Sequence, residues 1–148
     1  MAKINTAERI ALMRLMPEKT GFADRIVVRA MIEELSIDEE EKNEIGLYDM
    51  KNGSIGWMKD KQIDFNISKD RDRLIRKGIT EFVQSAGIIL DGFSQNIFDN
   101  LKWTNKELKE LDKVVDKMDK NEQITERVFD VCKRIKDKIP QEKSQTKK

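Results

Sequence analysis

The stretch GSIGWMKDKQIDFNIS, residues 53–68, decides the fold, because its apolar residues are spaced differently from those of the flanking chain. In its second half every other residue is apolar: Ile63, Phe65 and Ile67. A shorter apolar row lies upstream: Ile55 and Trp57. Alternation of this kind predicts strands with one apolar face. The polar run Lys59–Lys61 between the two rows suits a tight connection, so we expect a β-hairpin near 54–67.

A hairpin that stands alone is only marginally stable in water, so its apolar face has to pack on neighbouring helices. We therefore expect the hairpin to join an N-terminal and a C-terminal block of helices. Trp57 is its largest side chain, and we expect the indole to pack against the N-terminal helices.

The composition indicates one helical domain with a modest core. The 148 residues suit a single domain, with 39% charged and 38% hydrophobic residues. That is more charge and less apolar material than is usual, so a partner is expected to cover remaining apolar surface. The 29 basic and 28 acidic residues nearly cancel, and no global field favours a nucleic acid or a membrane.

The sequence lacks residue types on which several kinds of functional site depend. The chain has no histidine, which removes the commonest general base and metal ligand. Cys132 is the single cysteine, so it cannot form an intrachain disulfide or a cysteine-rich zinc site. No apolar run approaches the roughly 20 residues of a membrane span. We expect a cytoplasmic, non-enzymatic protein without a cofactor or metal and without membrane contact.

Capping signals place the helices of the N-terminal block. Asn5 and Glu8 have the spacing of a capping box, and Pro17 should end the helix that they begin. A second helix is expected over 22–35. Ser36 should cap a short third helix, whose acidic first turn suits the helix dipole.

The C-terminal block begins at Ser68 and contains the most apolar part of the chain. Its apolar stripe continues to Leu101, as one kinked helix or two. Two further helices are expected, the first behind the capping box Thr104–Glu107 and the last from Thr125. We predict a mainly α fold of five to seven helices with one small β-hairpin.

The domain is expected to cover residues 1–140, because Pro140 should stop the last helix. Residues 141–148 contain no apolar side chain and are expected to form a disordered basic tail.

Several short segments follow one another along the chain in a fixed order: Leu15-Met16-Pro17, Trp57, Ile63-Asp64-Phe65, Glu107-Leu108, Leu111-Asp112 and Ile124-Thr125. This order resembles that of small uncharacterised proteins encoded by bacteriophages and prophages. The resemblance covers most of the chain, implies a phage-related origin, and carries no activity with it.

A winged-helix reading is the main alternative, since helix, helix, short helix and hairpin follow in that order. The third helix would then enter the DNA major groove. Here it carries Asp38–Glu41, which phosphates would repel. The basic residues of Lys69–Lys77 alternate with aspartates and suggest ion pairs on a solvated helix. Nucleic acid is therefore not the expected partner.

Aromatic residues are the best candidates for a binding surface, because Trp and Tyr are enriched at interface hot spots. Core packing is the alternative for each of them, and Cys132 is expected to be a buried, inert thiol. The predicted function is binding of a partner protein or self-association. A nucleic-acid-binding regulatory module of winged-helix type is the second hypothesis. The candidate interaction residues are Tyr48, Trp57, Phe65 and Trp103.

Overall fold

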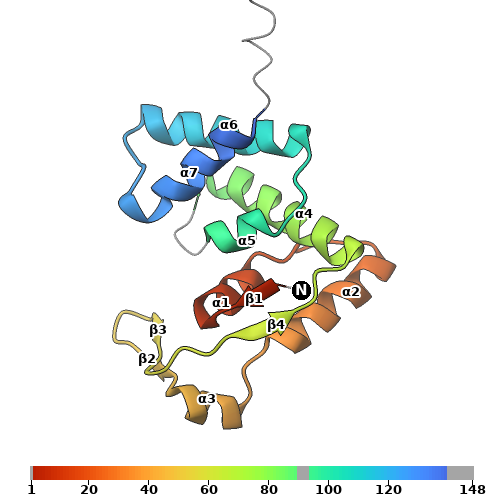
Figure 1. The fold of residues 1–148 in the computed structure, drawn as a ribbon, viewed down its shortest axis with the longest axis vertical. Coiled ribbons are helices and arrows are strands. Elements are labelled where there is room, and N and C mark those ends of the chain that lie inside the picture. Colours follow the sequence, from red (N-terminus) through yellow and green to blue (C-terminus); the bar gives the residue numbers. More distant parts are fainter. Residues whose placement is uncertain (1, 90–93, 140–148) are drawn as a thin grey trace, which may run out of the picture.

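The computed structural model describes residues 2–89 and 94–139, which form a mainly α fold (Figure 1). Seven helices and a small hairpin lie in these residues, so the predicted fold class is confirmed. The expected tail at 141–148 falls outside the described residues. No helix in the described part of the chain has the length and apolar character needed to cross a bilayer.

Three helices follow the N-terminal strand: α1 (Thr6–Arg14), α2 (Phe22–Leu35) and α3 (Glu39–Ile45). The capping box of α1 is confirmed, because Asn5 and Glu8 exchange backbone-to-side-chain bonds of 2.8 and 2.9 Å. The expected cap of α3 is wrong. Asp38 caps that helix, whereas the Ser36 hydroxyl donates back to α2 at Ile32.

The four strands pair differently from the expected hairpin. They are β1 (Ala2–Ile4), β2 (Tyr48–Asp49), β3 (Ile55–Gly56) and β4 (Ile63–Phe65). β4 pairs antiparallel with β1, and β3 pairs antiparallel with β2. The predicted pairing of residues 54–57 with 63–67 is therefore wrong, although the alternation in β4 does mark a strand.

The hairpin turn that the structure shows contains Asn52-Gly53, and Asn-Gly is the dipeptide that most strongly indicates a β-hairpin. Gly53 has φ +84°, which a residue with a side chain adopts only with strain. The turn is closed by a bond from the Met50 amide to the Ser54 carbonyl, 2.8 Å. This signal lay just upstream of the polar run that the sequence analysis took for the turn.

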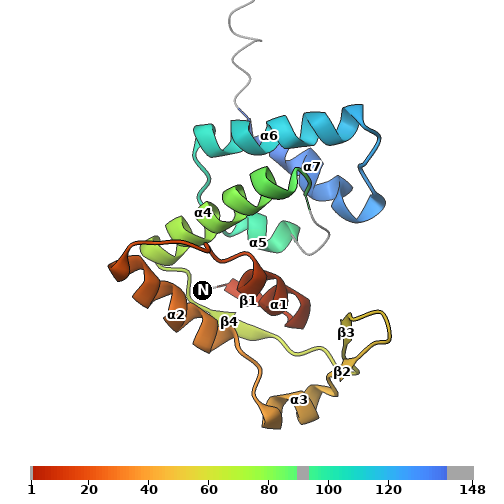
Figure 2. The same cartoon turned by 180° about the vertical axis from the view of Figure 1, so that it is seen from behind.

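The remaining helices are α4 (Lys69–Ala86), α5 (Gln95–Asp99), α6 (Asn105–Lys120) and α7 (Glu126–Lys138). The apolar stripe therefore belongs to two helices, because α4 ends at Gly87 in the left-handed conformation. The capping box at Thr104 and Glu107 is confirmed. Figures 1 and 2 show α4 crossing between the N-terminal elements and the pair α6–α7.

One hydrophobic core joins both blocks. It contains side chains of β1, β4 and every helix except α3, with Phe65 and Leu74 fully buried. Trp57 is half-buried and is not part of this core. The reason is the changed pairing, which joins its segment to β2 and not to β4.

Glu8 links the two blocks by polar contacts. Its side chain is 6% exposed and accepts from Ser94 Oγ at 2.7 Å and Asn96 Nδ2 at 3.0 Å. Ser94 is also the N-cap of α5, so a residue of α1 fixes the start of a helix in the C-terminal block.

Gly78 is the closest point between α4 and the segment that follows α1. A Cβ atom there would lie 2.0 Å from the Leu15 carbonyl oxygen and 2.8 Å from the Pro17 nitrogen. Both neighbours are backbone atoms, so they cannot move aside as a flexible side chain would. Only glycine fits this crossing.

Gly78→Ala should lower the free energy of unfolding by about 2–3 kcal/mol, because the overpacking outweighs the gain of roughly 1 kcal/mol in helix propensity. Urea denaturation measures this loss. The control is Ser85→Ala, at an exposed position of the same helix, which should stay within about 0.5 kcal/mol of the parent. Equal stability of the two variants would contradict the close crossing.

Candidate interaction surface

The helix α3 and the hairpin β2–β3 form a small unit at one end of the molecule, which we call the hairpin unit (residues 39–58). Figures 1 and 2 show it at the end away from α6 and α7. Ile45 is 1% exposed, yet it lies outside the main core. Its carbonyl oxygen accepts from the amides of Met58 and Lys59 at 2.9 and 3.0 Å. These bonds fix the hairpin to the end of α3.

Arg9 of α1 anchors the hairpin unit to the rest of the fold. The guanidinium is 2% exposed and donates two bonds of 2.8 Å to the Glu41 carboxylate. It also donates to the carbonyl oxygens of Leu35 and Ser36, at 3.2 and 2.9 Å. One buried side chain therefore joins α1, the end of α2 and α3. A fork-to-fork pair of this kind is among the stronger ion pairs.

Glu41 is held ionised by its neighbours. The hydrogen bonds from Arg9 lower the pKa of Glu41 to about 2, and Lys61 at 3.1 Å adds to the effect. The acidic run at 38–41 is thus more than a solvated helix start, because its last carboxylate has a structural role. The sequence pattern did not show this, since Arg9 and Glu41 are far apart in the chain.

Four large apolar side chains are exposed along the hairpin, on both of its faces, since Tyr48 lies opposite Gly56 whereas Ile55 lies opposite Asp49. We call this exposed set the hairpin patch, and Met58 is its most exposed member at 78%. Met residues are over-represented in interface cores. The sequence analysis named Tyr48 but missed the two methionines, because methionine carries no periodic signal in so short a segment. The members of the hairpin patch are Tyr48, Met50, Ile55 and Met58.

Tyr48 is held in place by the glycine opposite. Gly56 is its pairing partner, and a Cβ atom on Gly56 would lie 2.6 Å from Tyr48 Cζ. The ring therefore lies across the backbone of β3 and still exposes 49% of the residue. An aromatic ring fixed in this way loses little entropy on binding.

Two of the predicted interaction residues have structural roles. Phe65 is fully buried, and the Arg71 guanidinium lies 5.2 Å from its ring centroid. Trp103 stacks on Phe98 at 5.2 Å and donates its indole N–H to the Phe98 carbonyl at 3.0 Å. Neither belongs to the hairpin patch, whereas Tyr48 does and the half-buried Trp57 adjoins it in the chain.

Local ion pairs of the predicted kind are present, since Arg73 lies 3.7 Å from Asp70 and Arg76 pairs with Asp72. Arg71 pairs with Glu34, and Arg73 pairs with Asp24 at 2.8 Å. Both partners lie on α2, so the pairs tie α4 to α2 and do more than solvate one helix.

Arg76 joins this segment to α6. Its guanidinium lies 2.5 Å from both the Asp72 and the Glu107 carboxylates. Asp72 is 5% exposed and also accepts from the Lys102 amide at 2.9 Å. Because these carboxylates have cationic partners, the segment offers few free charges to a ligand.

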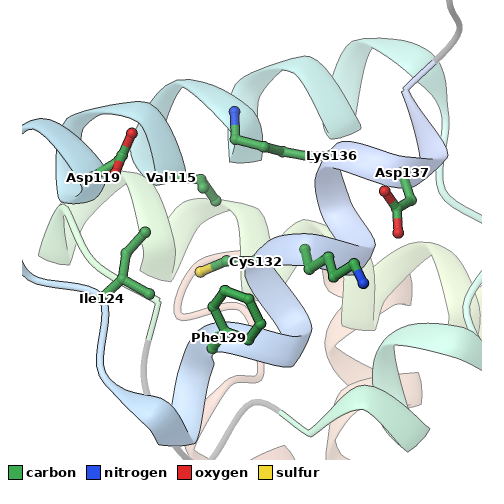
Figure 3. A pocket seen from close by; sticks show the side chains of 8 residues that line it. Val115, Asp119, Ile124, Phe129, Cys132, Lys136 and Asp137 are labelled. Carbon is green, nitrogen blue, oxygen red and sulfur yellow. The ribbon is translucent and has the colours of Figure 1, made fainter.

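A shallow hollow of about 290 Å³ lies between α6 and α7 (Figure 3). Val115, Ile124 and Phe129 give it apolar walls. Lys136 on its rim lies 2.8 Å from Asp112 and 2.6 Å from Asp116. Among the described residues no three acidic or cysteine side chains converge on a possible metal site.

Cys132 borders this hollow and is 3% exposed, on the core-facing stripe of α7 as predicted. Burial raises the pKa of the thiol, which keeps it in the unreactive form.

Comparisons with protein-family models, with curated proteins and with solved structures find no match to this chain. The resemblance to phage-encoded proteins therefore stays a prediction.

Glu41→Gln should lower the free energy of unfolding at pH 7 by about 3 kcal/mol, because it leaves the buried Arg9 charge without its counter-ion. The folded pKa of Glu41, about 2, lies below its usual value near 4.5. The ion pair thus contributes fully above about pH 4.5 and is lost as the pH falls toward 2. Denaturation series from pH 2 to 7 should show the two proteins converging in acid.

Glu39→Gln is the matched control. The Glu39 carboxylate is 87% exposed and pairs only with Lys42. The free energy of unfolding of this variant should therefore stay within about 0.5 kcal/mol of the parent. A constant difference between Glu41→Gln and the parent at every pH would show that the ion pair does not anchor the unit.

Cys132 should react with a thiol reagent far more slowly in the folded protein than in the unfolded chain, since the sulfur is enclosed. A variant carrying Cys132→Ala with Phe129→Cys supplies the control, because position 129 is 49% exposed on the same helix. The control thiol should react quickly in both states. Similar rates for Cys132 in both states would mean that α7 is not docked.

Proposed function

We propose that this chain is a non-enzymatic protein-binding module whose hairpin patch binds a partner protein. The observation that carries the proposal is the exposure of four large apolar side chains on one short hairpin: Tyr48, Met50, Ile55 and Met58, at 49, 45, 36 and 78%. Exposed apolar clusters of this kind mark interaction sites on soluble proteins. The buried Arg9–Glu41 anchor supports the proposal, because it presents the patch on a fixed base.

The charges around the patch suggest the partner's chemistry. Lys51 and Lys59 are exposed, and neither ammonium group has a carboxylate partner among the described residues. Asp49 on β2 and Asp60 beside Lys59 are exposed as well, so the charges next to the patch balance. A partner with an apolar surface and a rim of mixed charge would complement it. Charges at the rim act mainly on the association rate and on specificity.

The second hypothesis, a winged-helix module that binds nucleic acid through the hairpin and Lys69–Lys77, stays a prediction. No contact among the described residues favours it, since Arg71, Arg73 and Arg76 all have carboxylate partners.

The proposal is tested with a photo-crosslinking residue in place of Met58, in the full chain, exposed to a lysate of the source cell. The captured protein is then purified and titrated against the unlabelled chain. Met50→Asp with Met58→Asp should weaken that binding at least tenfold, as expected when hot-spot residues are lost.

The matched control is Phe22→Asp with Ile26→Asp. These residues form the other strongly exposed apolar pair, 86 and 58% exposed on α2. The control should leave binding within twofold of the parent. An equal loss of affinity in both double variants, or no loss of affinity in either, would reject the hairpin patch as the binding site. A dimer seen by light scattering that only the hairpin variant dissociates would identify the partner as a second copy.

A further inference from the structure

The outward face of α6 carries a row of lysines that the proposed function does not use. Every member is exposed, and successive members are three or four residues apart. At 3.6 residues per turn they fall within an arc of about 80°, opposite the buried face of the helix, and span about 21 Å of its axis. We call this row the lysine ridge: Lys106, Lys109, Lys113, Lys117 and Lys120.

The carboxylates of α6 are directed elsewhere. Glu107 pairs with Arg76 of α4, whereas Asp112 and Asp116 both pair with Lys136 of α7. Asp119 lines the hollow of Figure 3. Glu110 borders one side of the ridge, and Asp116, which is 61% exposed and pairs with Lys136, borders the other. None of the ridge lysines has an ion pair among the described residues, so the positive charges are concentrated on the solvent side.

The ridge lysines repel one another along the helix. Lys109 and Lys113, and likewise Lys113 and Lys117, are like charges four residues apart, and each such pair is unfavourable by roughly 0.3 kcal/mol. Alternating signs at these positions would have stabilised the helix. The net charge of the chain is only +1, so the ridge is a local feature with an effect over about 10 Å at 0.1 M salt.

We propose that the lysine ridge binds the phosphate backbone of double-stranded nucleic acid without reading its sequence. Lysine is a flexible point charge suited to such contacts, and a basic stripe along a helix is their usual footprint. The ridge has no aromatic side chain on which unpaired bases could stack, which favours a duplex over a single strand. This surface is separate from the hairpin and from Lys69–Lys77, and it is independent of the proposed protein binding.

The packing of α6 argues against a lipid surface. A helix that lies on a membrane inserts its apolar face between the lipids. In α6 that face is in the protein core, where Leu111 and Val115 are 0 and 1% exposed. The solvent side therefore offers charge alone, which is what a phosphate backbone needs.

The geometry sets the expected salt dependence. The ridge spans about six base pairs of duplex at 3.4 Å each, so as many as five phosphates can be neutralised. The logarithm of the association constant should then fall with the logarithm of the salt concentration with a slope of about −4.5. Raising the salt from 50 to 200 mM would weaken binding about 500-fold.

Fluorescence anisotropy with labelled 20-base-pair duplexes of two unrelated sequences tests the proposal on the full chain. The parent should bind both sequences within twofold of each other. The ridge variant combines Lys109→Gln, Lys113→Gln and Lys117→Gln. It should bind at least tenfold more weakly at 50 mM salt, with the slope reduced to about −2.

The matched control combines Lys51→Gln, Lys59→Gln and Lys69→Gln, which change the net charge equally on the surface that the winged-helix hypothesis would use. It should bind like the parent, and thermal melting should show both variants folded. Four results would each overturn the proposal: no binding by the parent at 50 mM salt, equal losses in the two variants, tighter binding of a single strand, or preferential binding of phosphatidylserine vesicles or polyglutamate.

Discussion

The enclosure of the Arg9 guanidinium is the constraint on which the rest of the structure depends. A buried cation has to be matched by acceptors, and those acceptors come from the end of α2 and from α3. The preceding residue, Glu8, makes the opposite connection, to Ser94 and Asn96 at the start of α5. Two consecutive charged residues of a short helix therefore set the positions of the hairpin unit and of the C-terminal helices. The apolar core packs between these elements and includes side chains of every helix except α3.

Charge in this molecule is sorted by location, although the totals nearly cancel. Between the helices, acids and bases meet in pairs such as Arg73 with Asp24 and Lys136 with Asp112. The two ends of the fold carry surfaces of different chemical character. One is the apolar hairpin patch, and the other is the lysine ridge. Two separate surfaces would let one chain hold two different ligands at once.

The sequence predicted the features that depend on residues close together in the chain. The capping boxes at Asn5 and Thr104 were predicted because the N-cap residue and its partner in the first turn of the helix are only three positions apart. The β4 alternation was recognised, but its partner was not, because β1 lies at the other end of the N-terminal block. The Asn52-Gly53 signal was present and was overlooked. The Arg9–Glu41 pair depends on a tertiary contact that no local pattern contains. The lysines of α6 are spaced three or four residues apart in the sequence, and this pattern was overlooked.

The pairing of β1 with β4 also constrains the order in which the chain can fold during synthesis. Ala2 has no strand partner until Phe65 has left the ribosome, so the first strand has to wait while α1, α2 and α3 emerge. Non-local pairing slows folding relative to a purely local helical bundle. The nascent N-terminal segment thus spends this interval as an unpaired edge with two apolar side chains, Ala2 and Ile4.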